Sequence, residues 1–385
     1  MTLRRVCFAL LVLFAFLTPY IAPAYNVFGL LAVLWLADAV RRRPAFAFAS
    51  LPAKLAALFA ACIALSTLFS RDPKISIRHL AGISLLLLLP IAMDLCDSPT
   101  RARAVCLAIA SSGIVISIVG FWQFAHGGND LGNRITANLS HYMTFSGLTM
   151  VSGCVLLGLA FEASGRWRAV GLAAVVPLGA MLLTFTRNAY VGTVAALIAY
   201  LALRRPRGLL LLPPALLLLF WLLPGPIRDR VRSIGDLEDP SNRDRVSMVK
   251  AGGRMIRDLP LFGLGPDMVK PYYVLYREPD AARWRVPHLH NNALQLAAAS
   301  GVFAALSYLA LAAAVLARTG RLLRAGSPPG VAPLLAGVWL ASVALFVAGL
   351  FEYNFGDTEI EMATLLLWAI PFGRGSVPEP PPRSD

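Results

Sequence analysis

The chain has 385 residues, of which 57% are hydrophobic and 15% charged, and its mean hydropathy is +0.66. This balance excludes a soluble globular protein of this length and predicts an integral membrane protein. The net charge of +14 does not require nucleic acid as a partner, because much of it lies between apolar runs. There, membrane insertion and anionic lipid headgroups account for it.

Apolar runs long enough to cross a membrane recur along the chain. A spanning helix needs about 20 mostly apolar residues. The runs predict about twelve spans: 6–22, 24–40, 52–69, 77–95, 104–125, 140–161, 169–186, 189–203, 208–223, 292–317, 331–350 and 359–372. They are continuous and rich in leucine and alanine, which favours helices over the alternating strands of a barrel. The predicted fold class is all-α, a polytopic membrane helical bundle of about 12 transmembrane helices.

The distribution of arginine predicts the orientation. If the amino terminus is inside, the inward loops carry most of the positive charge, as at 41–43, 204–207 and 318–324, and the short outward loops carry little. This is the asymmetry of cytoplasmic loops, and only the outward segment 71–78 departs from it. Both termini are therefore predicted to be cytoplasmic.

The sequence divides into four regions. Residues 1–223 are predicted to form transmembrane helices 1–9, and residues 291–372 transmembrane helices 10–12. Between them, 224–290 forms a large helical periplasmic loop, whose basic character favours an anionic ligand because long loops escape the positive-inside rule. Residues 373–385 are rich in proline and predict a disordered cytoplasmic tail.

One arginine stands in a minimal outward turn between two apolar runs. Arg187 lies within 184–188, at the edge of the predicted hydrocarbon region. An arginine there points to a functional site, and its permanent charge and paired donors suit a phosphate. The alternative is an interfacial arginine whose side chain reaches the lipid headgroups.

In the large loop we predict an amphipathic helix that begins after Asn242, as N-cap, and stops at Pro260. The Gly-Leu-Gly sequence at 263–265 then forms a tight turn. It is not a phosphate-binding loop, because no Lys-Ser/Thr follows it and no strand precedes it.

At the end of the loop, two histidines precede an apolar helix. His290 is the candidate base, because histidine exchanges a proton near neutral pH, and its place at the positive end of a helix favours the neutral form. The alternative is a residue that caps the helix. His288 is a weaker rival. Asn291 and Gln295, one helical turn apart, are candidates for binding a ligand or for hydrogen-bonding neighbouring helices.

Carboxylates on the outward side gather at 236–239 and 352–361, and neither cluster has a spacing that demands a cation. No metal and no cofactor are therefore predicted. Glu352 and Asp357, in the last outward turn, are expected to pair with arginines near the site.

These segments together resemble the O-antigen ligase and polymerase superfamily. The resemblance is carried by the arginine turn 186–190, by Arg245 with the run that ends at 258–265, and by the segment 290–295. The order, spacing and common outward side of these segments support the resemblance more strongly than any single motif does. Val249 departs from the family pattern, in which a tryptophan often follows the arginine.

The resemblance implies a GT-C-like glycosyltransferase of the bacterial inner membrane with a periplasmic active site. It implies an O-antigen ligase, with undecaprenyl-pyrophosphate-linked O-antigen as donor and lipid A-core as acceptor. Membrane lipids are expected as further partners. An O-antigen polymerase with a lipid-linked repeat as acceptor, and a protein O-oligosaccharyltransferase, are alternatives within the superfamily. A lipid or glycan transporter is the rival from another class, disfavoured because polar residues gather at the outer face rather than at mid-membrane.

Within this resemblance, Arg187 and Arg245 are predicted to bind the donor pyrophosphate, since guanidinium groups stabilise charge that develops on a leaving group. For Arg245 the alternative is an exposed helix face, as its neighbours on the same helix indicate. His290 is predicted to accept the proton of the acceptor hydroxyl. The possible contacts to the sugar or the acceptor are Asn291, Gln295 and His288.

Overall fold

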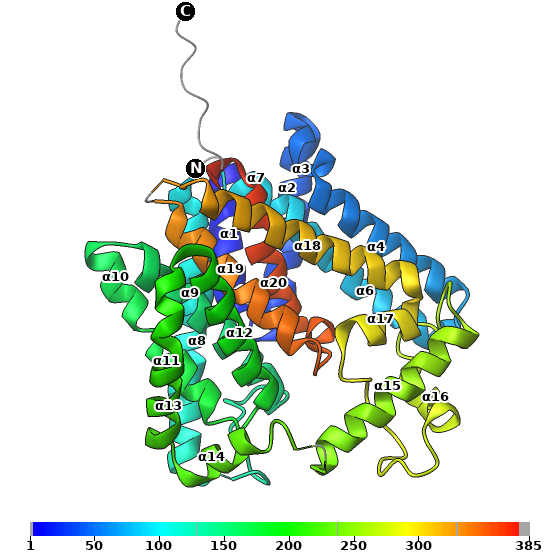
Figure 1. Ribbon diagram of the computed structural model, residues 1–385. Helices are drawn as coiled ribbons and strands as arrows, with labels where there is room; N and C mark the ends of the chain where they lie inside the picture. The colour runs from blue at the N-terminus through cyan, green and yellow to red at the C-terminus, as the bar shows by residue number, and fades with distance from the viewer. Residues whose placement is uncertain (1–2, 129, 237, 329, 377–385) are drawn as a thin grey trace, which may run out of the picture.

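The computed structural model describes residues 3–128, 130–236, 238–328 and 330–376, and within these ranges every regular element is a helix (Figure 1). The α-helices are α1 (Leu3–Leu17), α2 (Ile21–Arg42), α3 (Ala45–Ala49), α4 (Leu51–Leu68), α5 (Pro73–Ser76), α6 (Leu80–Ile83), α7 (Leu88–Leu95), α8 (Pro99–Ala125), α9 (Tyr142–Glu162), α10 (Gly165–Leu172), α11 (Val175–Leu182), α12 (Arg187–Arg204), α13 (Leu212–Leu222), α14 (Gly225–Arg232), α15 (Pro240–Asp258), α16 (Val269–Tyr276), α17 (Asn292–Ser300), α18 (Val302–Arg324), α19 (Ala332–Ala348) and α20 (Thr358–Ala369). The predicted all-α class is confirmed for the described residues. Of the predicted tail, Arg374–Ser376 form a short 3-10 helix, and 377–385 lie outside the described residues.

Six helical segments of the described chain are long and apolar enough to cross a membrane. They are Ile21–Arg42, Leu51–Leu68, Pro73–Leu95, Pro99–Ala125, Tyr142–Glu162 and Val302–Arg324. The predicted number of about twelve is not confirmed, because other apolar runs form shorter or broken helices. The run 169–186 is divided between α10 and α11.

A glycine divides the predicted span 292–317 into α17 and α18. Gly301 has φ 86°, and a Cβ there would lie 2.0 Å from the carbonyl oxygen of Leu261. Only glycine adopts this conformation at such a close approach without strain. The helix therefore breaks where the backbone at Leu261 approaches Gly301. Hydropathy does not reveal such a contact.

Small residues bring the central helices together. A Cβ at Gly158 of α9 would lie 2.2 Å from the backbone nitrogen of Gly337 in α19, and one at Gly192 of α12 would lie 2.5 Å from the carbonyl oxygen of Ala344 in α19. Close backbone approach at small residues is the usual way in which helices pack in a membrane. As a result α9, α12 and α19 form a tight centre from which α9 and α12 carry residues to the site.

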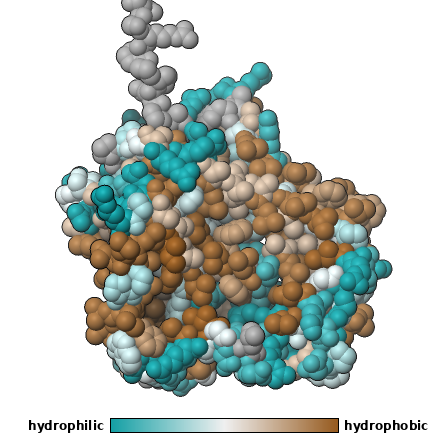
Figure 2. Space-filling view, viewed as in Figure 1, coloured by the Kyte–Doolittle hydropathy of each residue, from teal (hydrophilic) through white to brown (hydrophobic). Residues whose placement is uncertain are grey.

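Polar residues gather at opposite ends of the bundle, with a broad apolar band between them (Figure 2). Helices α14, α15 and α16, from the loop 224–290, lie toward the end opposite the start of α1, with α14 at the lower left and α15 and α16 at the lower right of the view (Figure 1). At that other end, Arg4 donates to Asp97 at 2.9 Å and the buried Asp94 accepts from Trp35 at 2.9 Å. This arrangement agrees with the predicted sidedness, which itself stays a prediction.

The N-cap of α15 differs from the prediction. Asp239 caps the helix, its Oδ1 accepting from the backbone N–H of Ser241 at 3.0 Å. Asn242 lies inside the first turn and donates from Nδ2 to the carbonyl of Asp236 at 2.6 Å. The sequence Asp239-Pro240 is itself an N-cap and N1 pair, so the signal was present three residues earlier than predicted.

The predicted tight turn at 263–265 attaches the large loop to the bundle. Gly263 and Gly265 have φ 66° and 111°, and the backbone N–H of Gly265 donates to the carbonyl of Ala299 in α17 at 2.8 Å. A Cβ on Gly263 would lie 2.5 Å from the backbone of Ala299. These glycines therefore serve close packing of backbone on backbone, which fixes α15 relative to the segment that carries His290.

Candidate active site

A polar cavity of about 630 Å³ lies at the end of the bundle that carries the large loop. The first turns of four helices reach it, through Tyr142 of α9, Arg187 of α12, Ser241 of α15 and Thr358 of α20. The amino end of a helix presents unpaired N–H groups and the positive end of the helix dipole. Four such ends around one cavity favour an anionic ligand.

The charged lining of the cavity contains five arginines beside the carboxylates of Asp244, Glu352, Asp357 and Glu359. Arg134, Arg187, Arg230, Arg245 and Arg283 line it. Two of them are the predicted residues, Arg187 and Arg245, which lie 58 positions apart in the sequence.

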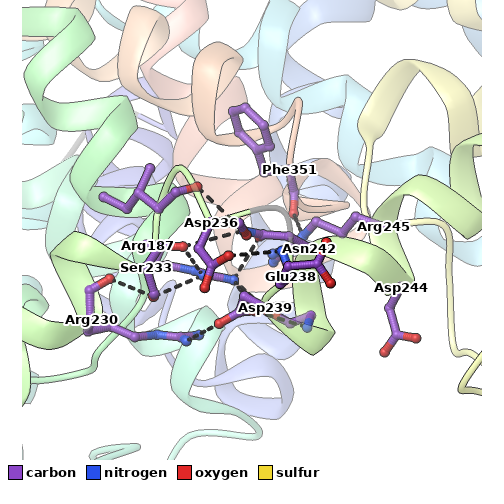
Figure 3. Close-up of polar contacts among 12 residues, drawn as sticks. Arg187, Arg230, Ser233, Asp236, Glu238, Asp239, Asn242, Asp244, Arg245 and Phe351 are labelled. Atoms are coloured by element: carbon purple, nitrogen blue, oxygen red, sulfur yellow. Dashed lines mark hydrogen bonds and ion pairs between the residues drawn. The ribbon is translucent and has the colours of Figure 1, made fainter.

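Arg187 is buried and fully engaged by the loop that follows α14. Its side chain is 6% exposed. Nη1 donates to the carbonyl and hydroxyl of Ser233 at 2.6 and 3.0 Å, and Nη2 donates to Asp239 at 3.1 Å, to Asn242 at 2.8 Å and to Ser241 (Figure 3). In this state Arg187 holds the entrance to α15 in place, and a phosphate would reach its Nη2 by displacing Asp239.

Asp239 occupies the position of an anion between two arginines. Its Oδ2 lies 3.7 Å from Nη1 of Arg230. Nε of the same arginine donates to the carbonyl of Phe185 at 3.1 Å. Burial raises the pKa of Asp239, but hydrogen bonds from Ser241 and Arg187 outweigh it and lower the pKa to about 2. Burial, together with the charges of Arg187 and Arg134, lowers the pKa of Arg230 to about 10. The single negative charge of Asp239 therefore does not neutralise the positive charges of Arg187, Arg230 and Arg134.

Arg245 has side-chain N–H groups that make no hydrogen bond among the described residues. Its Nε donates to the carbonyl of Phe351 at 3.1 Å (Figure 3), and within the described part of the chain its two terminal nitrogens have no acceptor. Burial, followed by the charge of Arg187, lowers the pKa of Arg245 although Glu352 raises it. The terminal nitrogens of Arg245 can therefore bind an incoming anion without rearrangement.

The predicted base lies in the same cavity and is paired with a carboxylate. His290 is 12% exposed, and its Nδ1 lies 2.8 Å from Oε2 of Glu352. Glu352 Oε1 lies 3.4 Å from Nε2 of His288. Burial raises the pKa of Glu352, but its hydrogen bond and charge interaction with His290 lower it overall. Glu352 is therefore an ionised carboxylate held between two histidines.

The expectation that Glu352 and Asp357 pair with arginines is wrong. Glu352 contacts His288 and His290 instead, and Asp357 accepts from the hydroxyl of Thr144 at 2.5 Å. Burial and a hydrogen bond with Glu359 raise the pKa of Asp357 well above its usual range. Sequence proximity could not reveal these partners, because each comes from a different helix end.

Asn291 and Gln295 do not line the cavity. Asn291 caps α17 by accepting from the N–H of Leu294 at 2.9 Å and donates to the carbonyl of Leu350 at 3.0 Å. Gln295 accepts from the N–H of Leu289 at 2.9 Å. Their amides thus hold the segment around His290, and we do not assign them sugar contacts.

His288, His290 and Glu352 also form the group with donor atoms close enough to bind a metal ion, since these atoms lie within 4.8 Å of one another. Nδ1 of His290 and Oε2 of Glu352, however, lie at hydrogen-bond distance, 2.8 Å. Ligands of one tetrahedral zinc ion lie about 3.4 Å apart, given bond lengths of about 2.1 Å. The geometry as it stands is therefore that of a hydrogen bond.

Sequence reasoning did not select Arg134, Arg230 or Arg283, and it expected a different contact for Glu352. Arg134 was detectable, because it belongs to the same sparse set of outward arginines as Arg187. Arg230 had no signal that separated it from the other basic residues of the loop. Glu352 was noticed but assigned to the wrong partners.

The bundle and the cavity define a class of protein, a multispanning helical membrane protein with an arginine-rich pocket beside a histidine–carboxylate pair. Residues 172–309 match the family model described as O-antigen ligase. The match confirms the resemblance predicted from the sequence and places this region in the O-antigen ligase superfamily, glycosyltransferase-like enzymes that include ligases and related polymerases. A search of curated proteins gave no significant match.

Proposed function

We propose that this protein is an O-antigen ligase, which transfers O-antigen polysaccharide from undecaprenyl pyrophosphate to a sugar hydroxyl of lipid A-core. The observation that carries the proposal is a single cavity in which Arg245 has unused donors and His290 is paired with an ionised carboxylate. An arginine for a leaving pyrophosphate and a base for an incoming hydroxyl are the two groups that such a transfer requires.

The reaction makes one bond and breaks one. The acceptor hydroxyl oxygen attacks the anomeric carbon of the donor sugar, and the bond from that carbon to the pyrophosphate oxygen breaks. The electron pair leaves with undecaprenyl pyrophosphate, and the hydroxyl proton passes to His290. Arg245 offsets the negative charge that grows on the leaving oxygen, and its charge takes the place of a metal ion.

Arg187 and Arg230 complete the pyrophosphate site in this proposal. In the structure, Asp239 forms ion pairs with both arginines. A pyrophosphate carries more charge than one carboxylate, so it competes with Asp239 for Arg187. The entrance to α15, which Arg187 now holds, would then loosen or move as the donor binds.

The acceptor distinguishes the ligase from its alternatives. We favour the ligase over the polymerase because the chain is compact with one dominant external loop. The test is reconstitution of the purified protein in lipid with undecaprenyl-pyrophosphate glycan and one of three acceptors: lipid A-core, a second lipid-linked repeat, or an acceptor protein. Extension of lipid A-core, in the presence of EDTA, is the expected result. Extension of the lipid-linked repeat alone would identify a polymerase, and movement of intact donor across the bilayer without transfer would identify a transporter.

We propose a periplasmic site with both termini cytoplasmic. In intact cells, a cysteine at Asp280, in the large loop, is expected to react with a membrane-impermeant thiol reagent. A cysteine at Ala325, which follows α18, is expected to react only after lysis. The five native cysteines are replaced in the background used for labelling. Labelling of the Ala325 variant from outside would contradict this orientation.

A further inference from the structure

The carboxylate of Glu352 is held by more than its histidine neighbours. Its side chain is buried, at 5% exposed. Oε1 accepts from the backbone N–H of Tyr353 at 3.0 Å and faces His288 Nε2, while Oε2 faces His290 Nδ1 at 2.8 Å. Each oxygen therefore has a donor, and the carboxylate has one preferred orientation.

These contacts fix which nitrogen of each ring carries hydrogen. An ionised carboxylate only accepts hydrogen bonds, so Nδ1 of His290 must donate and Nε2 is the nitrogen left to accept a proton. For His288, Nδ1 accepts from the backbone N–H of His290 at 3.3 Å. Burial lowers the pKa of His288 to about 4, so this ring is neutral and its hydrogen lies on Nε2, toward Glu352.

The turn that carries Glu352 is joined rigidly to the segment that carries His290. The backbone N–H of Asn292 donates to the carbonyl of Gly349 at 2.8 Å, and its side chain donates to Asn354 at 2.7 Å and accepts from the N–H of Phe355 at 3.1 Å. His290 itself has φ 49°, a conformation that costs energy for a residue with a side chain. The surrounding bonds hold this strained position, which is typical of functional sites.

The same turn also reaches the arginine. The carbonyl of Phe351 accepts from Arg245, and the side chain of the next residue, Glu352, binds His290. Two adjacent residues therefore set the positions of the proposed leaving-group arginine and the proposed base.

We propose that Glu352 is a positioning residue, which holds His290 with hydrogen on Nδ1 and with Nε2 free to take the acceptor proton, while His288 steadies the carboxylate. This inference rests on the proposed function. When the acceptor O–H bond breaks, its proton goes to Nε2 and the ring becomes imidazolium. Glu352 stabilises that positive charge across the Nδ1 hydrogen bond, without itself taking the proton.

The test replaces Glu352 with glutamine, which keeps the size of the side chain and removes its charge. Because glutamine can donate as well as accept, it no longer dictates the tautomer of His290. We expect kcat to fall by about 10²-fold, within the range that a general base contributes, with little change in KM for the donor. The acid limb of the pH–rate profile should move to lower pH, because the imidazolium form loses its carboxylate. The titratable or charged groups that interact with His290 or Glu352 are His288, His141 before α9, Arg245 and Asp357. Tyr353 packs against the ring of His288.

Two further variants separate positioning from folding. Glu352→Asp keeps the charge, so it should recover part of kcat and retain the wild-type acid limb. Glu162→Gln is the matched control, since Glu162 binds Arg204 at 3.0 Å, away from the cavity. That change should leave the pH profile unaltered. The inference would be overturned if Glu352→Gln kept the wild-type kcat and pH profile. It would also be overturned if the acid limb of the pH–rate profile shifted as far in Glu352→Asp as in Glu352→Gln.

A readout independent of transfer distinguishes this inference from the proposed function. Solid-state ¹⁵N NMR of histidine-labelled protein at alkaline pH should show His290 protonated at Nδ1 only, its signal identified by its loss in His290→Ala. Glu352→Gln should populate the form with hydrogen on Nε2. A wild-type protein that transfers no glycan would remove the proposed function and leave this result standing. An equimolar zinc ion whose binding requires Glu352 would replace the hydrogen-bond assignment with a metal site.

Discussion

Replacing His290 with alanine is expected to lower kcat for glycan transfer by about 10²–10⁴-fold, the contribution of a general base. This corresponds to about 3–5 kcal/mol of activation free energy. The acceptor hydroxyl would have to lose its proton to water, while Arg245 and its neighbours still bind the pyrophosphate. Donor affinity, measured by titration of the reconstituted protein with undecaprenyl-pyrophosphate glycan in the absence of acceptor, should therefore change little.

His79→Ala is the matched control for this variant. His79 lies in the apolar segment Pro73–Leu95, 3.7 Å from the carboxylate of Asp267, and it does not line the cavity. It should transfer glycan at the wild-type rate. If His290→Ala also does so, His290 is not the base.

Replacing Arg245 with alanine is expected to lower kcat/KM by about 10²–10³-fold, the usual effect of losing one contact to developing charge. Its terminal nitrogens have no acceptor in the described part of the chain, so the loss should fall on the ligand and little on the fold. Arg245→Lys should recover only part of the rate, because lysine offers a point charge in place of a planar pair of donors. Steady-state transfer kinetics, together with thermal unfolding in detergent, check both expectations.

Arg243→Ala provides the comparison on the same helix. Arg243 is exposed and does not line the cavity, so it should keep wild-type kinetics. Equal losses in the two variants would mean that Arg245 acts only through the general positive charge of the loop. Full activity in Arg245→Ala would remove it from the site.

Local sequence predicted several parts of the site correctly. Arg187 and His290 were selected from their place between apolar runs and from their order along the chain, and both line one cavity. The end of α15 at Asp258 followed from Pro260, because proline cannot continue a helix. Such features depend on residues within one or two helical turns, which is the range over which a single sequence is informative.

The number of spans could not be predicted as well. Hydropathy treats 292–317 as one segment, but the approach of the Leu261 carbonyl to Gly301 divides it. The close approach involves residues 40 positions apart in the sequence. A continuous apolar run therefore establishes that a segment is buried in an apolar environment, but not that it is one straight helix.

By itself, the sequence determined that this is a helical membrane protein with a large basic loop, because composition and run length decide whether a segment prefers lipid or water. Only the tertiary structure decided how the charged groups are paired. Arg187 bonds to acceptors 46 to 55 residues away, and His290 meets Glu352 across 62 residues. These pairs form because helix ends from distant parts of the chain pack around one cavity, where a buried charge must find a partner, and nothing local to either residue specifies which partner that is.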